Sequence, residues 1–172
     1  MAVTYTEIAS VTVGSGGSSS ITFSSIPNTY TDFKIVGSTR DDRGAYANSP
    51  VTMTHINGSA VSGVNTKNVN TNGSVVFSEN ASELWAGEST RVGQTANTFS
   101  NWECYIPNYA GSQYKSMSIE AVTENNATEA SDQIAAALWQ NTAAIASFRL
   151  TPNYGTAFQQ YSTFYLYGIK NS

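Results

Sequence analysis

The 172-residue sequence is poor in the residues that enzymes most often use for catalysis. It contains one cysteine, Cys104, and one histidine, His55. A single cysteine excludes an intrachain disulfide, and one Cys with one His does not make a zinc site of ordinary composition. Cys104 lies between Trp102 and Ile106 on the apolar side of a predicted strand, so we expect an unreactive core thiol. We expect His55 to be exposed or hydrogen-bonded rather than a catalytic base, and we predict no enzymatic activity and no cofactor.

Charge is also scarce. Charged residues make up 12% of the chain, about half the usual share, and the net charge is −4. Lys and Arg together number 8 and form no run, whereas a nucleic-acid binder needs a basic stripe to displace counterions. No stretch approaches the roughly 18 apolar residues of a membrane span. We therefore expect neither nucleic-acid binding nor membrane insertion.

The surface composition is typical of proteins that work outside cells, whereas the first residues are not those of an exported chain. Ser, Thr, Asn and Gly supply most of the polar positions, as in proteins that work outside cells. Residues 1–11 lack the basic and apolar segments of a signal peptide. These features together predict a chain that is made in a cytoplasm and functions outside it, as a virion component does.

Strand patterns recur along the whole chain, and no segment shows a sustained helical period. The alternation of apolar and polar residues is strongest over 101–106 and 116–122. The predicted strands are 5–13, 21–23, 33–36, 51–56, 75–77, 84–86, 101–106, 116–122, 134–139, 148–151 and 161–169. This spacing predicts one all-β domain over residues 1–172, an antiparallel β-sandwich of jelly-roll type.

Polar segments between these strands are expected to be loops. Residues 40–50 and 87–94 are turn-rich, and Asn57-Gly58 is a strong tight-turn signal. The Ser/Asn/Thr-rich residues 58–73 are expected to form a long surface excursion, with one short edge strand around 61–69.

The acidic residues offer two candidate sites. Asp41-Asp42-Arg43 is the densest charge cluster and could bind Ca²⁺, but adjacent Asp residues are commonly just turn formers. Glu79, Glu83 and Glu88 could pair with Asp132 as glycosidase carboxylates, although sequence spacing alone does not establish that geometry. We expect neither a metal site nor hydrolysis.

Aromatic residues near loops suggest a carbohydrate-binding site. Sugar rings pack against exposed aromatic side chains, but Trp and Tyr equally fill sandwich cores or subunit interfaces, which we favour. The candidates are Trp85, Trp139, Tyr109, Tyr114 and Tyr154.

The last predicted strand has apolar residues on both sides. Phe164 and Leu166 share one side, and Tyr165, Tyr167 and Ile169 share the other. Two apolar sides are typical of a central strand or of one covered by a partner. We expect Tyr165, Tyr167 and Ile169 to serve either inter-sheet packing or an interface.

Several segments resemble a family of small virion proteins from tailed phages of marine and aquatic bacteria, including cyanophages. Members are head decoration or knob-like proteins, or tail-fibre modules. The segments that carry the resemblance are TYTEIASVTVGSGGSSSITFSSIPNTYTDF (4–33), TANTFSNWECYIPNYAG (95–111), KSMSIEAVT (115–123), ENNAT (124–128) and FQQYSTFYLYGIKNS (158–172). Residues 58–93 do not match the family.

The resemblance implies a β-sandwich displayed on the virion, without catalytic residues. The first strand begins by about Tyr5, which leaves no room for a fibre shaft. We therefore expect a capsid decoration protein on the outside of the major capsid protein, either monomeric or a homo-oligomer such as a trimer. The alternative is a tail-fibre or receptor-binding module that binds host surface glycans, losing that binding when Trp85 or Trp139 is replaced by Ala.

Overall fold

A computed structural model of the chain describes residues 4–44, 49–124, 126 and 130–170. All regular secondary structure in these residues is β-strand. Within the same residues, no helix is long and apolar enough to cross a membrane.

The larger of the two main sheets has eight antiparallel strands. Their order is β1 (Thr4–Thr12), β15 (Thr163–Lys170), β3 (Asp32–Ser38), β11 (Asn101–Ile106), β12 (Lys115–Thr123), β13 (Ser131–Trp139), β7 (Val64–Thr71) and β8 (Val76–Ala81). The strands that begin and end the described chain, β1 and β15, are hydrogen-bonded neighbours.

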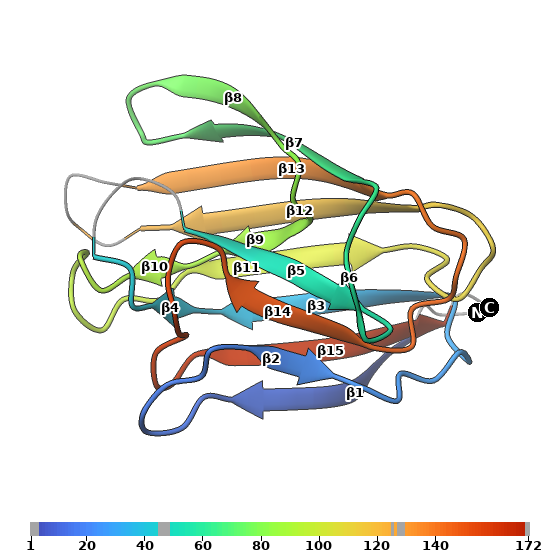
Figure 1. The fold of residues 1–172 in the computed structure, drawn as a ribbon. Coiled ribbons are helices and arrows are strands. Elements are labelled where there is room, and N and C mark those ends of the chain that lie inside the picture. Colours follow the sequence, from blue (N-terminus) through green and yellow to red (C-terminus); the bar gives the residue numbers. More distant parts are fainter. Residues whose placement is uncertain (1–3, 45–48, 125, 127–129, 171–172) are drawn as a thin grey trace.

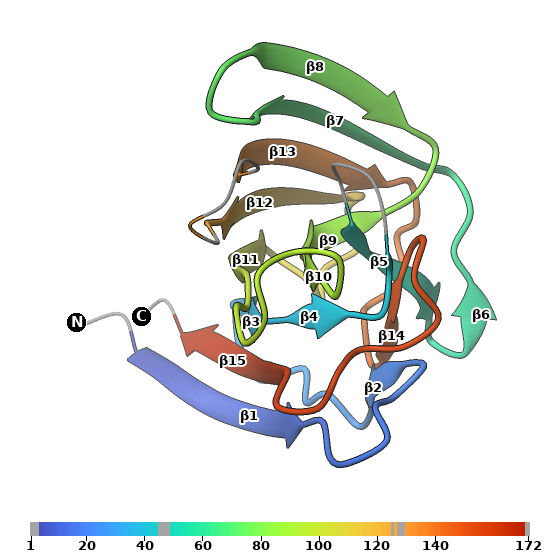
Figure 2. The same cartoon turned by 90° about the vertical axis from the view of Figure 1, so that its left-hand side faces the viewer.

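A smaller sheet packs against part of one side of this larger sheet (Figure 1). It contains β2 (Ile21–Phe23), β14 (Phe148–Pro152), β5 (Pro50–Ile56) and β6 (Ser59–Ala60), with β9 (Trp85–Glu88) also paired to β5. Two very short strands, β4 (Arg40–Asp41) and β10 (Thr90–Arg91), form a separate parallel pair. The β7–β8 hairpin extends beyond the smaller sheet, as Figure 2 shows.

The core lies between the two sheets and is built from the inward-facing residues of each strand. Cys104 is fully buried there, as predicted, beside the equally buried Trp102 and Ile106. Tyr109 is also fully buried, and its ring packs 4.8 Å from that of Phe33, measured between centroids. A two-layer sandwich of this kind confirms the predicted fold class.

Most predicted strands are confirmed within one to three residues of their ends. The Asn57-Gly58 turn is also confirmed: both residues have positive φ, of 52° and 79°, and they join β5 to β6. The ambiguous alanine-rich segment 134–139 belongs to β13 and is a strand.

Three loop predictions are wrong. Residues 58–73 contain β7, an eight-residue strand in the interior of the larger sheet rather than a short edge strand. Residues 40–50 and 87–94 contain the short strands β4 and β10, whose residues are buried. Residues 45–48 of the first predicted loop lie outside the described part of the chain.

Strand β7, predicted only as a short edge strand around 61–69, has an inverted pattern. Its inward residues Thr66, Asn68 and Asn70 are polar yet buried, whereas Val69 points outward and is 54% exposed. Strand prediction relies on apolar residues facing the core, so this segment gives no such signal.

Candidate functional site

The side of the larger sheet that faces away from the smaller sheet is one candidate site, here called the outer face. No described strand packs over this face, which is the convex side of the sheet in Figure 2. Strand register identifies its residues, because alternate positions point to opposite sides of a sheet. Tyr167 is the cross-strand partner of Lys34, and Lys34 is the partner of Tyr105.

One half of the outer face carries tyrosines. The rings of Tyr165 and Tyr167 stack with their centroids 6.3 Å apart, and Tyr5 is 55% exposed on the neighbouring β1. Lys34 lies near these rings, with Nζ 5.9 Å from the Tyr5 centroid, and donates to Glu103 Oε1 at 2.8 Å. This ion pair neutralises two of the few charges on the face.

The other half carries exposed aliphatic residues. Ile134 of β13 and Val69 of β7 are direct cross-strand partners, 68% and 54% exposed. Val122 and Val76 are exposed nearby, 41% and 70% respectively. Aliphatic side chains left this exposed on neighbouring strands are typical of a surface that meets another molecule.

The three residues predicted on the last strand have different environments. Tyr165 and Tyr167 are half-buried on the outer face and do not pack between the sheets. Ile169 is 3% exposed, so its side chain offers almost no contact surface. Inter-sheet packing and an interface were the two roles predicted for this set. Because Tyr165 and Tyr167 lie on the uncovered outer face, they are available for an interface.

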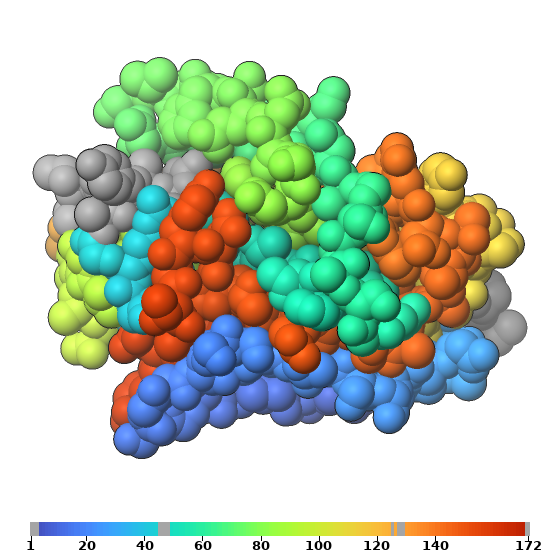
Figure 3. All heavy atoms as spheres, in the orientation of Figure 1, coloured from blue at the N-terminus to red at the C-terminus, as the bar shows by residue number. Residues whose placement is uncertain are grey.

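A cleft under the β7–β8 hairpin is the second candidate site. It has a volume of about 720 Å³, within the range of ligand pockets. In Figure 3 the green hairpin rises above the orange-red loop that follows β14. The cleft is lined by Arg43, Pro50, Phe77, Glu79, Asn80, Ala81, Ser82, Glu83, Trp85 and Tyr154.

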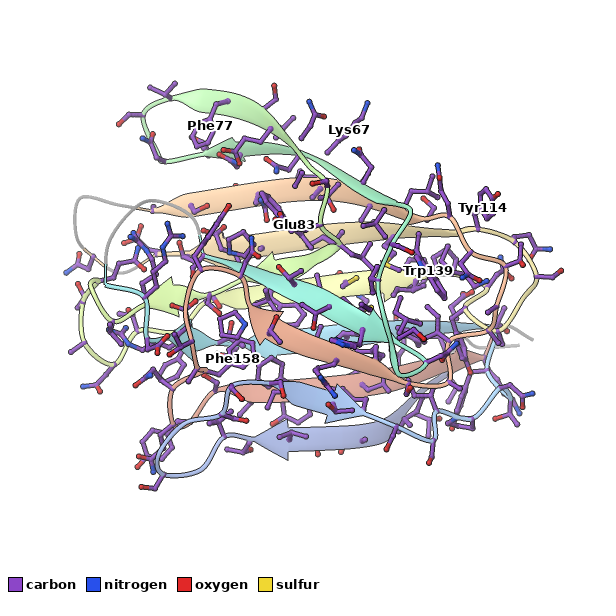
Figure 4. The ribbon with its side chains drawn as sticks, in the orientation of Figure 1. Lys67, Phe77, Glu83, Tyr114, Trp139 and Phe158 are labelled. Carbon is purple, nitrogen blue, oxygen red and sulfur yellow. The ribbon has the colours of Figure 1, made fainter. Side chains whose placement is uncertain are left out.

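Aromatic rings and a guanidinium form part of the lining. The Arg43 guanidinium lies over the Tyr154 ring, 4.3 Å from its centroid. Tyr154 is nevertheless 57% exposed, whereas Trp85 is only 4% exposed. Phe77 is half-buried on β8, and Figure 4 shows it on the hairpin, with Glu83 on the segment that leads away from it.

The carboxylates of the cleft are held by neighbours. Trp85 Nε1 donates to Glu83 Oε2 at 3.3 Å. Asn70 Nδ2 donates to Asn68 Oδ1 at 2.8 Å and lies 3.4 Å from Glu79 Oε2. Register places Asn68 opposite Glu79 on the inward side of the hairpin.

The aromatic residues that were candidates for carbohydrate binding therefore lie in different places in the fold. Trp85 and Tyr154 line the same cleft, and Tyr114 is 58% exposed outside it. Tyr109 is in the core, where its hydroxyl donates to the carbonyl of Pro27. Trp139 is 5% exposed in the core, in agreement with the favoured core role, and it lies away from Phe77 and Glu83 in Figure 4 and outside the cleft lining.

The acidic candidates are also separated. Glu79 and Glu83 line the cleft, whereas Asp132 faces outward as the partner of Val122. Glu88 is 2% exposed between the sheets and accepts a hydrogen bond from Ser131 Oγ at 2.8 Å. Burial raises the pKa of Glu88 to about 7, so this group titrates near neutral pH.

The Asp41-Asp42 pair anchors loops by hydrogen bonds. Asp41 is buried and accepts from the hydroxyl of Ser49, and Asp42 accepts from the backbone and hydroxyl of Thr156. Among the residues described, no three His, Cys, Asp or Glu side chains are grouped closely enough to hold a metal ion.

Cys104 and His55 have different surroundings. Burial raises the pKa of the Cys104 thiol to about 12, so the thiolate is scarce at neutral pH. His55 Nδ1 lies 3.3 Å from the hydroxyl of Thr54.

Sequence reasoning named several residues of both sites but missed others, among them Phe77 and Ile134. Phe77 and Ile134 were assigned to strands, but nothing in their local pattern indicated that one borders a cleft and the other faces solvent. Ile134 follows Gln133, which is 2% exposed, so the apolar residue faces outward and the polar one inward. Strand pairing, which brings Ile134 beside Val69, was the missing information.

Comparison with known proteins does not assign the chain to a family. No protein-family model matches it, and neither does any curated protein or solved structure searched. Its function must therefore be inferred from the outer face and the cleft themselves.

Proposed function

We propose that the chain is a non-enzymatic structural protein of a bacteriophage virion, bound to the outside of the major capsid shell. The observation that carries the proposal is the outer face, an uncovered sheet surface with exposed aliphatic and tyrosine side chains. It extends across eight strands, which makes it a broad surface for a flat partner. The class of the partner, a major capsid protein, is what the resemblance of several segments to small virion proteins implies.

Charge favours a particular kind of partner surface. Lys34 and Glu103 neutralise each other, which leaves Glu7, Glu120 and Asp132 against Lys67 on the strands of the outer face. A capsid surface that is mainly uncharged, with a slight positive excess, is complementary to this pattern. Adhesion then comes from burying Ile134, Val69 and the tyrosines rather than from ion pairs.

The low charge of the whole chain suits the same role. A protein that stays bound to a particle needs one extensive contact surface. It does not need a charged patch that binds a charged polymer. The smaller sheet, and the side of the β7–β8 hairpin that lines the cleft, would then point away from the shell.

Electron microscopy of particles labelled with an antibody against this chain tests the proposal. Label distributed over the capsid supports it. Label confined to the tail supports the second candidate, a tail-fibre or receptor-binding module, which the cleft under the β7–β8 hairpin favours. Absence of label on intact and on disrupted particles would exclude both.

A further inference from the structure

The cleft under the β7–β8 hairpin combines two kinds of surface. Phe77, Trp85 and Pro50 are apolar, and Glu79, Glu83 and Asn80 offer hydrogen-bonding groups. A sugar ring has the matching character, since its C–H faces pack on aromatic rings while its hydroxyls form hydrogen bonds at the edges. We infer that this cleft binds a short, uncharged oligosaccharide, an activity that is separate from attachment to a virion and does not depend on it.

Tyr154 supplies the accessible ring. Its side chain is 57% exposed, and the Arg43 guanidinium covers one face at 4.3 Å from the ring centroid. Stacking on a cation fixes the orientation of an exposed tyrosine. Tyr154 therefore contributes an oriented and exposed ring to the lining of the cleft.

Trp85 supports the cleft through a hydrogen bond and not through an exposed ring. With 4% exposure it cannot offer a wide ring face to a ligand. Its indole N–H instead donates to the Glu83 carboxylate at 3.3 Å, which orients an acceptor that faces the cleft. Trp85 is therefore a positioning residue for Glu83.

Glu79 is oriented by the inward-facing amides of β7. Asn70 Nδ2 lies between Asn68 Oδ1 and Glu79 Oε2. Carboxylates fixed in this way accept hydrogen bonds from neighbouring hydroxyls of one sugar ring without first losing side-chain entropy.

The two asparagines that orient Glu79 are themselves buried. Asn70 and Asn68 are 2% and 4% exposed, yet Asn70 Oδ1 and Asn68 Nδ2 have no hydrogen-bond partner among the described residues. Neither asparagine lines the cleft, so a ligand there would meet Glu79, whereas the two amides support that carboxylate from the enclosed side. They lie on the same side of the hairpin as Glu79, which borders the cleft.

Charge decides which saccharides fit. Two carboxylates, Glu79 and Glu83, face the cleft, against one guanidinium that is stacked on Tyr154. A sialylated or sulfated sugar would bring its own negative charge against these carboxylates. The cleft therefore selects neutral hexose or N-acetylhexosamine chains and rejects acidic ones.

A glycan array probed with the full-length folded protein tests the assignment, followed by calorimetric titration with the strongest neutral oligosaccharide. Tyr154→Ala is expected to weaken binding about tenfold or more, and Glu83→Gln to weaken it as well. Tyr114→Ala is the matched control, because Tyr114 is equally exposed, at 58%, but lies outside the cleft. Thermal unfolding establishes that each variant is folded.

Three results would overturn the inference. These are a folded wild-type protein that binds no neutral oligosaccharide, a preference for sialylated or sulfated chains, and equal losses in Tyr154→Ala and Tyr114→Ala. Because the experiment uses free protein, its failure leaves the proposed virion location to be decided by microscopy.

Discussion

The indole ring of Trp102 occupies the space that a side chain would need at Gly87. Trp102 comes from β11 of the larger sheet and Gly87 from β9, which pairs with the smaller sheet. A Cβ built on Gly87 would lie 2.2 Å from Cδ2 of the indole. The indole is 1% exposed, and its N–H donates to the hydroxyl of Thr39 at 3.0 Å. A Cβ at Gly37 would also lie 2.2 Å from the ring, so the two glycines together make room for the largest buried side chain.

Gly87→Ala is therefore expected to destabilise the fold by about 1–3 kcal/mol, since the fixed indole cannot move away from an added methyl group. Gly14→Ala is the control, because nothing lies within 4 Å of a Cβ at Gly14. That variant should stay within about 0.5 kcal/mol of wild type. Urea unfolding of both variants checks the prediction, and equal stabilities would contradict the packing described.

Glu88 should make stability fall as pH rises. Burial raises its pKa from 4.5 to about 7 in the folded chain, so the folded state holds the proton more tightly than the unfolded state. The stability that protonated Glu88 contributes is fully present below the pKa of Glu88 in the unfolded chain. It is lost as pH rises through the pKa of Glu88 in the folded chain, and the free energy of unfolding falls by up to about 3 kcal/mol.

Glu88→Gln removes that titration while retaining a group of similar shape. The variant should lose less stability than wild type between about pH 5 and about pH 8 in urea unfolding. Identical pH dependence in the two proteins would show that Glu88 does not titrate in this range.

Cys104 should be inert in the native protein. It is fully buried, and its pKa is raised to about 12, so neither access nor ionisation favours a thiol reagent. Labelling is expected only after denaturation, and Cys104→Ser should destabilise by about 1–3 kcal/mol through its buried hydroxyl. Rapid modification of the native chain, followed by mass spectrometry, would contradict this placement.

The sequence alone predicted those strands whose apolar residues face the core. β11, β12 and β14 were predicted because Trp102, Met117 and Leu150 alternate with polar neighbours. β7 was predicted only as a short edge strand because its inward residues Asn68 and Asn70 are polar, so local pattern and burial disagree. Asn68 and Asn70 are also the neighbours of Glu79, whose position in the cleft no local pattern indicates.

The outer face was only partly predictable for a related reason. Tyr165 and Tyr167 stood out because their strand has two apolar sides. Ile134 and Val69 become neighbours only when β13 pairs with β7, 65 residues apart in sequence by their numbers. Long-range pairing of this kind is set by the whole sheet rather than by either segment.

Charging the outer face should abolish attachment without unfolding the protein. Ile134→Lys and Val69→Lys replace exposed side chains, so each is expected to change stability by about 0.5 kcal/mol or less. Both should prevent rebinding to particles stripped of the protein, because a lysine would be desolvated against an apolar partner. Tyr161→Lys, on an exposed residue outside the sheets, is the control and should rebind normally. Cosedimentation with stripped particles measures all three, and rebinding of Ile134→Lys at wild-type levels would exclude this face.

The copy number of the chain in purified phage particles tests the central proposal most directly. Quantitative mass spectrometry should find it in a fixed ratio to the major capsid protein, of the same order as the capsid subunits, as expected for a protein that covers the shell. A handful of copies per particle, matching tail components instead, would contradict capsid decoration, as would its complete absence from the particle.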